Sequence, residues 1–475
     1  MRTLLLFVCA LPALADTGNA VCARCHAAIA RQYAQTGMAQ SSGRVGQSPF
    51  KENLTDPRVS PAFLLQLGET SRQLEYFIGS GHIGRSYLFR RAGQLFQAPL
   101  SYFSAPKEWN TSPGFQHKPY PEFTRAVEPA CLQCHTSPSR PFADSGVTCE
   151  RCHGPGERHA ARPAKSNIVN PAKLAPEQRD SVCAQCHLTG VARFARANRE
   201  RGAYQPGDKL SDSIAIFVIE DAALSATSHM EKLAASRCQL ATGDKLWCGT
   251  CHTAHADSTP EYYKSKCQGC HQPGSCTANA GNDCVGCHMP KRPTHSLEHL
   301  AFTDHSIPRR PSIGAAAANH GKIKEFWTGQ ANERDTAMAH SITNLDDAYQ
   351  LLQESVKINP KDLPLQLQLA QQHERYAQDG KAQTLYTEIL QSDPANTTAL
   401  INLGTLRIKA GKAKEAMALW LRALAKNPAL IGARLNLAVA QYQSGDPASA
   451  KASLKAVLEF EPAHPAALRM LAQLP

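Results

Sequence analysis

The sequence predicts a mainly α-helical protein in two domains. An irregular domain rich in cysteine and histidine, with a small β-hairpin, precedes an α-solenoid of helical repeats. Three observations predict this fold class. Cysteine, histidine, glycine and proline are concentrated before about residue 311, where no long helical period is sustained. From about residue 323 onward there is no cysteine, and alanine, leucine, lysine and glutamine dominate. There a single pattern returns every 34 residues, which is typical of stacked helix pairs.

The composition is that of a globular chain of two or three domains. It has 475 residues, of which 42% are hydrophobic and 19% charged, and this excludes wholesale disorder and collagen-like repeats. The formal net charge of +11 usually raises nucleic acid or an anionic membrane as a partner.

The predicted signal peptide covers residues 1–15. Arg2 precedes an apolar run from Leu4 to Leu14, and Ala13-Leu14-Ala15 is a small-residue cleavage site. A short buried helix is the alternative. The longest later apolar run, Ile214–Ile219, suits a buried strand, because a membrane-spanning helix needs about 20 apolar residues. We expect an exported protein, periplasmic or at the cell surface or exterior, with no transmembrane anchor in the mature chain.

The first domain is predicted to cover residues 16–312 and to contain a β-hairpin. Residues 86–90 and 94–104 are rich in aromatic and apolar residues, and the turn-forming Arg91-Ala92-Gly93 separates them.

Seven copies of Cys-x-x-Cys-His use fourteen of the seventeen cysteines. Zinc ribbons and redox dithiols also use Cys-x-x-Cys, but neither requires histidine directly after it. Seven such copies predict covalent attachment of seven haem c groups. The motifs are Cys22/Cys25/His26, Cys131/Cys134/His135, Cys149/Cys152/His153, Cys183/Cys186/His187, Cys248/Cys251/His252, Cys267/Cys270/His271 and Cys284/Cys287/His288.

The chemistry of attachment explains this spacing. Two thiols add to the two vinyl groups of one haem, and a two-residue gap brings both sulfurs to one side of a helical turn. The adjacent histidine then points its imidazole at the iron as the proximal ligand. Haem propionates carry negative charge that the formal count omits, so the net charge of +11 is no argument for nucleic-acid binding, and we expect none.

A second set of residues is predicted to supply the sixth ligands of the irons. For each histidine the alternative is a surface or propionate-bonding role, and for Met38 it is a place in the core. His255 lies three residues after His252, too close to reach the other face of the same haem, so it would serve a neighbour. The candidates are His82, His159, His229, His255, His299, His305 and Met38, with His117, His295 and His320 in reserve.

Met38 differs from the other candidates because it lies twelve residues after His26 and is not a histidine. A Met/His pair of ligands raises the potential of a haem. Two further cysteines of the mature chain, Cys238 and Cys276, either pair with each other or stay as packed thiols.

Residues 313–328 are predicted to form a linker, and residues 329–475 a repeat domain. Four alanines recur at intervals of 34 residues, and a large apolar residue follows each of them by four positions. Gly411 and Gly445 stand where the two helices of a pair turn. An unrelated helical bundle is the alternative. The pattern resembles the tetratricopeptide repeat, with about three complete units and a degenerate one before them. It consists of Pro360, Pro394, Pro428 and Pro462, each twelve residues after Ala348, Ala382, Ala416 or Ala450.

Three segments of the first domain resemble the multihaem cytochromes c related to the nitrification tetrahaem cytochrome and the hydroxylamine oxidoreductase group. Exported multihaem cytochromes with C-terminal tetratricopeptide repeats look similar along the whole mature chain. The resemblance implies haems stacked in parallel and perpendicular pairs, along which electrons hop. The segments are Cys149 to His159, Cys248 to His255, and Cys284 to Lys291 followed by Phe302-Thr303-Asp304-His305.

We therefore expect an electron-transfer protein whose repeats dock a redox partner protein. The second hypothesis is a nitrite, hydroxylamine or sulfur-oxyanion oxidoreductase with one open iron. It ranks lower because the chain has no Cys-x-x-Cys-Lys motif, so we name no catalytic residue. A third hypothesis is a scaffold whose haems serve sensing.

Overall fold

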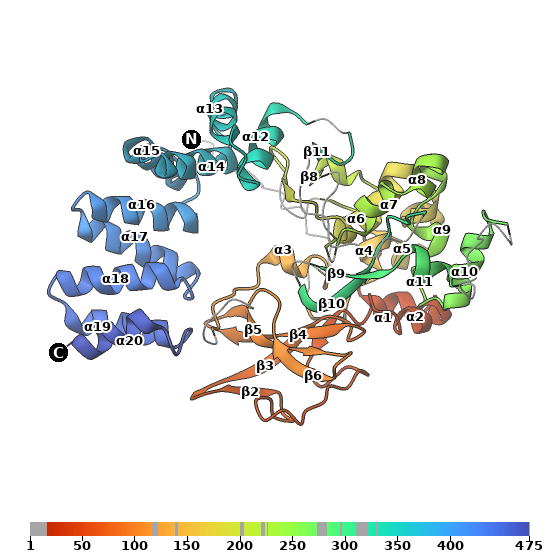
Figure 1. Cartoon of the computed structure of the whole chain (residues 1–475), viewed down its shortest axis with the longest axis horizontal. Coiled ribbons are helices and arrows are strands. Elements are labelled where there is room, and N and C mark those ends of the chain that lie inside the picture. Colours follow the sequence, from red (N-terminus) through yellow and green to blue (C-terminus); the bar gives the residue numbers. More distant parts are fainter. Residues whose placement is uncertain are drawn as a thin grey trace, which may run out of the picture.

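The computed structural model describes most of the chain and shows helices with a modest content of sheet (Figure 1). The predicted signal peptide and the reserve residues His117, His295 and His320 lie outside the described residues, as does Cys276. The described ranges are 17–115, 122–137, 141–199, 204–219, 224–225, 227–272, 283–294, 297–309, 322–328 and 331–474.

The predicted hairpin is present as β4 (Gly84–Arg91) and β5 (Gln94–Phe103), but it belongs to a larger sheet. The antiparallel order is β1-β3-β4-β5-β6, and β2 also pairs with β3. The predicted hairpin therefore accounts for only two of the six strands of this sheet. The flanking strands are short, or bury residues only toward one end, so their alternation is weak in the sequence. They are β1 (Ser42–Arg44), β2 (Leu64–Leu67), β3 (Thr70–Ile78) and β6 (Glu108–Thr111).

A second sheet has three antiparallel strands in the order β11-β8-β7. Its central strand β8 (Ile214–Ile219) is the apolar run predicted to be a buried strand, and five of its six residues are buried. Strand β7 (Ala192–Ala195) pairs on one side and β11 (Ile323–Glu325) on the other. The segment predicted as a linker thus contains a strand of this sheet. A separate hairpin joins β9 (Lys291–Thr294) and β10 (Leu297–Thr303).

Short helices carry the rest of the first domain, and most of them contribute little to a protein core. Among the described residues, α1, α2, α4, α5, α8, α9, α10 and α11 contain no buried residue. Packing against protein therefore does not account for their stability. The helices are α1 (Asn19–Ala23), α2 (Ala27–Tyr33), α3 (Pro129–Leu132), α4 (Glu150–His153), α5 (Glu157–Ala161), α6 (Pro176–His187), α7 (His229–Ala234), α8 (Arg237–Thr242), α9 (Cys248–Cys251), α10 (Pro260–Gln268) and α11 (Cys284–His288), with 3-10 turns at Lys165–Asn167, Pro171–Lys173, Leu210–Asp212 and Gly243–Lys245.

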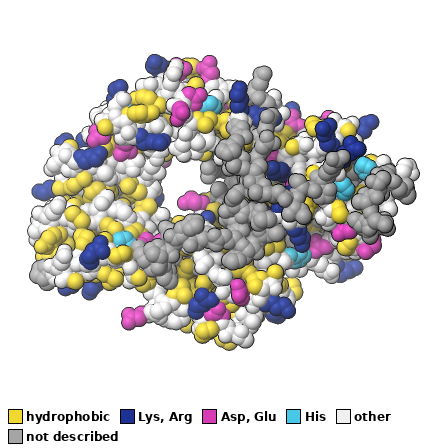
Figure 2. Space-filling view, viewed as in Figure 1, with side chains coloured by type: hydrophobic (Ala, Val, Ile, Leu, Met, Phe, Trp, Pro, Cys, Tyr) yellow, Lys and Arg dark blue, Asp and Glu magenta, His cyan; other side chains and the backbone are white. Residues whose placement is uncertain are grey.

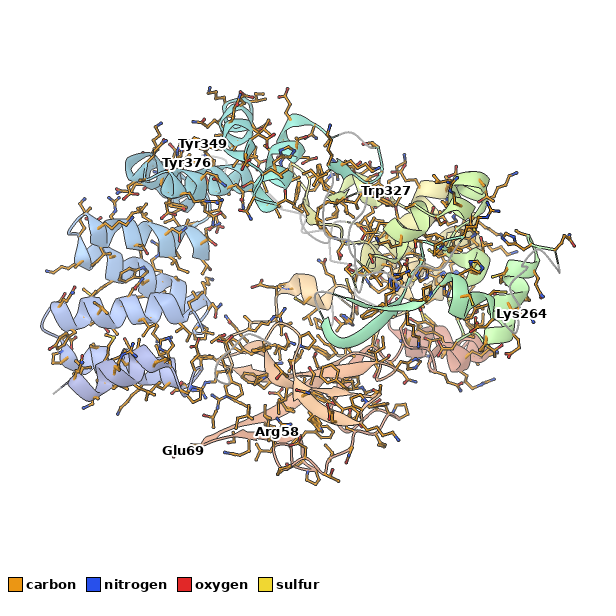
Figure 3. All side chains as sticks on the ribbon, viewed as in Figure 1. Arg58, Glu69, Lys264, Trp327, Tyr349 and Tyr376 are labelled. Carbon is orange, nitrogen blue, oxygen red and sulfur yellow. The ribbon has the colours of Figure 1, made fainter. Side chains whose placement is uncertain are left out.

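The repeat domain consists of four antiparallel helix pairs and a final helix. The first pair forms where the sequence predicted a degenerate repeat. Tyr349 of its second helix packs against Tyr376, at the end of the next helix, with ring centres 4.6 Å apart and 33° between the ring planes (Figure 3). The helices are α12 (Glu333–Ile342), α13 (Ala348–Ile358), α14 (Leu363–Arg375), α15 (Asp379–Ser392), α16 (Thr397–Lys409), α17 (Ala413–Lys426), α18 (Ile431–Gln443), α19 (Pro447–Leu458) and α20 (Pro465–Gln473).

The repeated residues form the cores between these helices. The alanines Ala382, Ala416 and Ala450 are fully buried, and Trp420 is only 1% exposed. Gly404 on α16 faces the Trp420 indole so closely that a β-carbon would lie 2.5 Å from Nε1. Small residues at these positions let the paired helices approach one another.

Both ends of the repeat domain contact the first domain. At one end Arg334 of α12 donates to the Ala195 carbonyl at 3.0 Å, and Arg196 forms ion pairs with Glu325 and Asp335. At the other end Phe460, 3% exposed, packs into the core of the six-stranded sheet.

The contact at Phe460 is also polar. The Phe123 amide donates to the Phe460 carbonyl at 2.7 Å, Arg91 pairs with Glu459, and Gln94 donates to the Lys426 carbonyl. The molecule is therefore a closed ring, and Figure 2 shows an opening between the repeats and the rest.

Candidate functional site

Each Cys-x-x-Cys-His motif lies in or beside a short helical segment. In four motifs the histidine amide donates to the carbonyl of the first cysteine, at 2.9 Å for His26, 3.0 Å for His153, 2.8 Å for His252 and 2.9 Å for His271. This bond closes one helical turn over the motif. The two thiols and the imidazole of a motif are thereby held at the ends of a single turn.

The motifs are not spread over the domain but contact one another through their sulfur atoms. Cys149 hydrogen-bonds to Cys22 and lowers the pKa of the Cys22 thiol to about 7. Cys186 does the same for Cys134, whose pKa falls to about 6. The bond to Cys134 and burial raise the pKa of Cys186, and the charge of Cys152 adds to the effect. The thiol hydrogen bonds join the first motif to the third and the second to the fourth. The fourth motif also meets the third, because Gln185 Nε2 donates to the Arg151 carbonyl at 2.8 Å.

The remaining motifs continue the same cluster. A hydrogen bond from Cys183 lowers the pKa of Cys248, so the fourth and fifth motifs touch. Burial, and then the nearby charge of Cys267, raise the pKa of Cys251. Burial and the charge of Cys284 raise the pKa of Cys267 in turn. All seven motifs therefore belong to one connected group.

Four cysteines that the sequence assigned to haem attachment lie apart from these contacts between motifs. The thiols of Cys25, Cys131 and Cys270 are exposed, and that of Cys287 is half-buried. In each of these motifs the other thiol is the one that interacts with a neighbouring motif. In the first, second, sixth and seventh motifs the structure therefore brings only one of the two thiols near another motif. Thioether bonds at the other four thiols stay a prediction. The contacting partners are Cys22, Cys134, Cys267 and Cys284.

Four motif histidines each lie opposite a histidine from outside the motifs. The ring centres of His26 and His159 are 6.3 Å apart, with 17° between the ring planes. Those of His153 and His255 are 5.8 Å apart at 8°. Each pair joins segments that are distant in the sequence.

The other two pairs lie side by side. His252 and His305 have ring centres 6.2 Å apart at 25°, and His187 and His229 have centres 5.2 Å apart at 89°. The rings of His229 and His305 are themselves 4.8 Å apart. The four outer histidines are among the residues that the sequence proposed as sixth ligands.

Hydrogen bonds at Nδ1 orient several of these imidazoles. The bonds run to main-chain carbonyls, from His153 to Val169 at 2.8 Å and from His159 to Ala164 at 3.0 Å. His288 and His305 bond Pro308 at 2.9 Å and Thr303 at 3.0 Å. A carbonyl accepts only, so each Nδ1 carries the proton and each Nε2 keeps its lone pair for a metal.

Burial favours the neutral form of five imidazoles in this group. It lowers the pKa of His187, His252, His255 and His305, and neighbouring histidines add to the effect at the first three. For His229, burial, then His187, lower the pKa to about 3. A neutral imidazole is the form that binds a metal.

These residues fit haem c on the chemistry of the donor set. The motifs supply paired thiols beside an imidazole, and the short helices α4, α9 and α11 that carry three of them bury no residue. Several buried polar atoms also have no partner among the described residues, including Tyr204 Oη, Trp327 Nε1 and His135 Nδ1. Trp327 packs in one apolar cluster with Cys183 and Cys248 (Figure 3). Neither Trp327 nor Tyr204 stands out in the pattern of the sequence.

The remaining predicted ligands are less closely placed. His82 is exposed in the turn before β4, with its ring beside Gly37. Met38 is half-buried, and its carbonyl accepts from the Val147 amide at 2.9 Å. His299 lies in β10, and its side chain is outside the described part. Cys238 is a free thiol.

Comparison with known proteins bears on the repeat domain. A family model described as tetratricopeptide repeat matches residues 408–474. No curated protein matches the chain. Tetratricopeptide repeats are protein-interaction modules, and this part of the chain carries them. Among the described residues, no helix is both long and apolar enough to cross a membrane.

Solved structures resemble the same region. A crystal structure of MamA protein shares 16% identity over 30% of this chain and 80% of its own, with a TM-score of 0.28. A second MamA crystal structure shares 22% identity over 30% of this chain and 78% of its own, with the same TM-score of 0.28. A tetratricopeptide repeat protein from Parabacteroides merdae ATCC 43184 shares 19% identity over 29% of this chain and 57% of its own, at 0.27.

Proposed function

We propose that this protein is an exported multihaem c-type cytochrome that transfers electrons through seven covalently attached haems. The observation that carries the proposal is the set of three nearly parallel histidine pairs, each with one motif histidine. Metal–imidazole bonds are about 2.0 Å long, so two imidazoles on opposite faces of one iron hold their ring centres about 6 Å apart. The pairs at 6.3, 5.8 and 6.2 Å agree with that distance.

The pairs define a ligand set for four irons. His26 and His159 would hold the first, His153 and His255 the third, His187 and His229 the fourth, and His252 and His305 the fifth. His159 thus serves the first motif, although it follows the third in the sequence. Because His26 already faces His159, Met38 is not needed at the first haem.

The second haem draws its sixth ligand from a different neighbourhood. The Ser42 hydroxyl donates to the His135 carbonyl at 2.6 Å, which ties the segment after Met38 to the second motif. Ser41 makes a similar bond at 3.2 Å. We therefore assign Met38 and His82 as the candidates there, and His299 as a candidate for one of the last two haems.

The contacts between motifs support a continuous route for electrons. Bound haem supplies iron that alternates between its ferric and ferrous states. The chain holds the first motif against the third, the fourth against the second and the fifth, and the last three in sequence. The side chains of Tyr33 and Arg151 lie beside cysteines of this group.

The repeat domain supports the second half of the proposal, docking of a redox partner protein. We place this activity in the periplasm, or at the cell surface, because thioether attachment of haem occurs outside the cytoplasm and residues 1–15 have the pattern of a signal peptide.

A haem count and a spin-state measurement test the function together. The protein is produced with the c-type maturation machinery, and haem is quantified by pyridine haemochrome and mass spectrometry. We expect seven haems, and six in the double variant Cys284→Ser/Cys287→Ser. The matched control Cys238→Ser changes a cysteine outside the motifs and keeps seven. Failure to attach haem would contradict the proposal, and a high-spin iron that binds nitrite or hydroxylamine would favour an oxidoreductase.

A further inference from the structure

Tyr263 on α10 contacts the proximal histidine of the fifth motif. Its hydroxyl lies 3.3 Å from Nδ1 of His252. The two rings meet edge to face, with centres 5.3 Å apart and 67° between their planes. The hydroxyl and the ring of Tyr263 together orient the His252 imidazole. The ring of His305 is the second neighbour of this imidazole.

This contact differs in kind from the others in the domain. The Nδ1 bonds of His153, His159, His288 and His305 run to main-chain carbonyls. Such acceptors belong to the backbone and remain after any side-chain substitution. At His252 the acceptor is a side chain, so one conservative substitution removes it and leaves the backbone unchanged.

If Nε2 of His252 binds a metal, the hydrogen bond between His252 and Tyr263 can run in only one direction. Nδ1 of His252 then carries the proton and donates it to the phenolic oxygen. A ligand histidine that donates from its second nitrogen is a more basic ligand, and this favours the higher oxidation state of the metal. Loss of the acceptor therefore raises the reduction potential at that site.

We propose that Tyr263 is a positioning residue of the fifth haem. It holds the His252 imidazole with Nε2 toward His305, and it lowers the reduction potential of that one iron relative to a histidine without an acceptor. This inference rests on the proposed function.

The helix that carries Tyr263 also provides a matched control. Helix α10 starts at Pro260, and its cap is the Thr259 hydroxyl, which accepts from the Tyr262 amide. The ring of the neighbouring Tyr262 meets that of Tyr263 edge to face, with centres 5.9 Å apart, and Lys266 Nζ lies 4.7 Å from the Tyr262 ring centre. Lys264 marks the position of this helix at the outer edge of the domain (Figure 3). Tyr262→Phe thus removes a hydroxyl from the same helix without touching His252.

The experiment compares three holoproteins, the wild type, Tyr263→Phe and Tyr262→Phe. Haem is counted first, and then each protein is titrated potentiometrically with EPR and optical detection. We expect seven haems in all three. In Tyr263→Phe one of the seven redox transitions shifts to a higher potential, and the low-spin EPR signal of one haem changes. Tyr262→Phe leaves all seven transitions at their wild-type positions.

The other outcomes separate this inference from the proposed function. Unchanged potentials in Tyr263→Phe, or equal shifts in both variants, would overturn the role of Tyr263 and leave the cytochrome proposal standing. A Tyr263→Phe protein with fewer than seven haems would make Tyr263 a structural residue, which also overturns the inference. A wild-type protein without haem would refute the proposed function itself.

Discussion

At the scale of single residues, the pairs of imidazoles carry the chemical argument. Each pair combines a motif histidine held by a helical turn with a histidine from a loop or another helix. His153 and His255 are the most nearly parallel of the four pairs, at 8°, and His153 is locked by its bond to the Val169 carbonyl. Its partner His255 lies in the segment after α9.

Removal of His255 therefore tests the ligand assignment. In the His255→Ala holoprotein the third iron loses its sixth ligand, because no other described imidazole lies opposite His153. We expect a new high-spin EPR signal from about one haem in seven, and binding of carbon monoxide to the reduced protein. His340→Ala is the control, since His340 bonds Asp347 in the repeat domain. A His255→Ala protein that stays fully low-spin would contradict the pair.

At the scale of elements, the two domains are stabilised in different ways. The repeat helices bury alanines and large apolar residues against each other, whereas eight short helices in the described part of the first domain bury no residue. These short helices need a source of stability other than a protein core. In the proposed function, the attached cofactors supply it. The repeat helices need no such help.

Gly404 gives a sharp test of the repeat packing. A β-carbon at this position would lie 2.5 Å from Trp420 Nε1, and the indole is held by its bond to the Ile401 carbonyl at 3.2 Å. We expect Gly404→Ala to destabilise the protein by about 1–3 kcal/mol through overpacking. Gly432→Ala on α18 meets no described atom within 4 Å and should stabilise it by about 0.4–1 kcal/mol. Thermal or urea unfolding measures both, and equal effects would contradict the packing.

The elements differ in how far the sequence determines them. The hairpin at residues 84–103, the strand at Ile214–Ile219 and the repeats follow from local patterns, so these predictions are confirmed. The sequence also selected His159, His229, His255 and His305, but not their partners. His159 follows the third motif and lies opposite His26 of the first, and only the folded backbone brings those segments together.

Long-range contacts explain the other gaps. The six-stranded sheet adds strands of weak alternation to the hairpin, and strand β11 pairs with a segment more than a hundred positions earlier. The spacing of Cys-x-x-Cys-His is the same in all seven motifs, so it cannot tell which thiol of a motif, such as Cys22 rather than Cys25, meets a neighbour. Tyr263 gave no signal, since an aromatic residue on a short polar helix is ordinary in a sequence. The haem ligands themselves stay a prediction.

At the scale of the whole molecule, the closure of the ring is the main feature. The repeat domain contacts the first domain through the Arg196–Asp335 ion pair at one end and through Phe460 at the other. A repeat array with both ends attached has less freedom to change its curvature than one with a free end. The inner surface of the repeats is thereby held at a defined distance from the Cys-x-x-Cys-His motifs.

Phe460→Ala should open this ring. Loss of a large buried aromatic side chain destabilises a protein by about 3–5 kcal/mol. Here the loss weakens the contact between the repeat domain and the six-stranded sheet. We expect a lower unfolding temperature and a larger radius of gyration in X-ray scattering, with the haem count unchanged. Leu468→Ala on α20 is the control, because Leu468 is 47% exposed. An unchanged radius of gyration together with wild-type stability would show that the closure does not depend on Phe460.

The place of Phe460 has a consequence for how the chain reaches its native state. A sheet formed by residues 42–111 has part of its apolar core supplied by Ala429 and Phe460. During synthesis the sheet emerges early, but its last core residues arrive more than three hundred positions later. A segment that emerges early is then among the last to be completed, and its apolar face stays open until the end of the repeat domain has formed. A chaperone that shields this face during maturation would serve the longest-lived intermediate of the molecule.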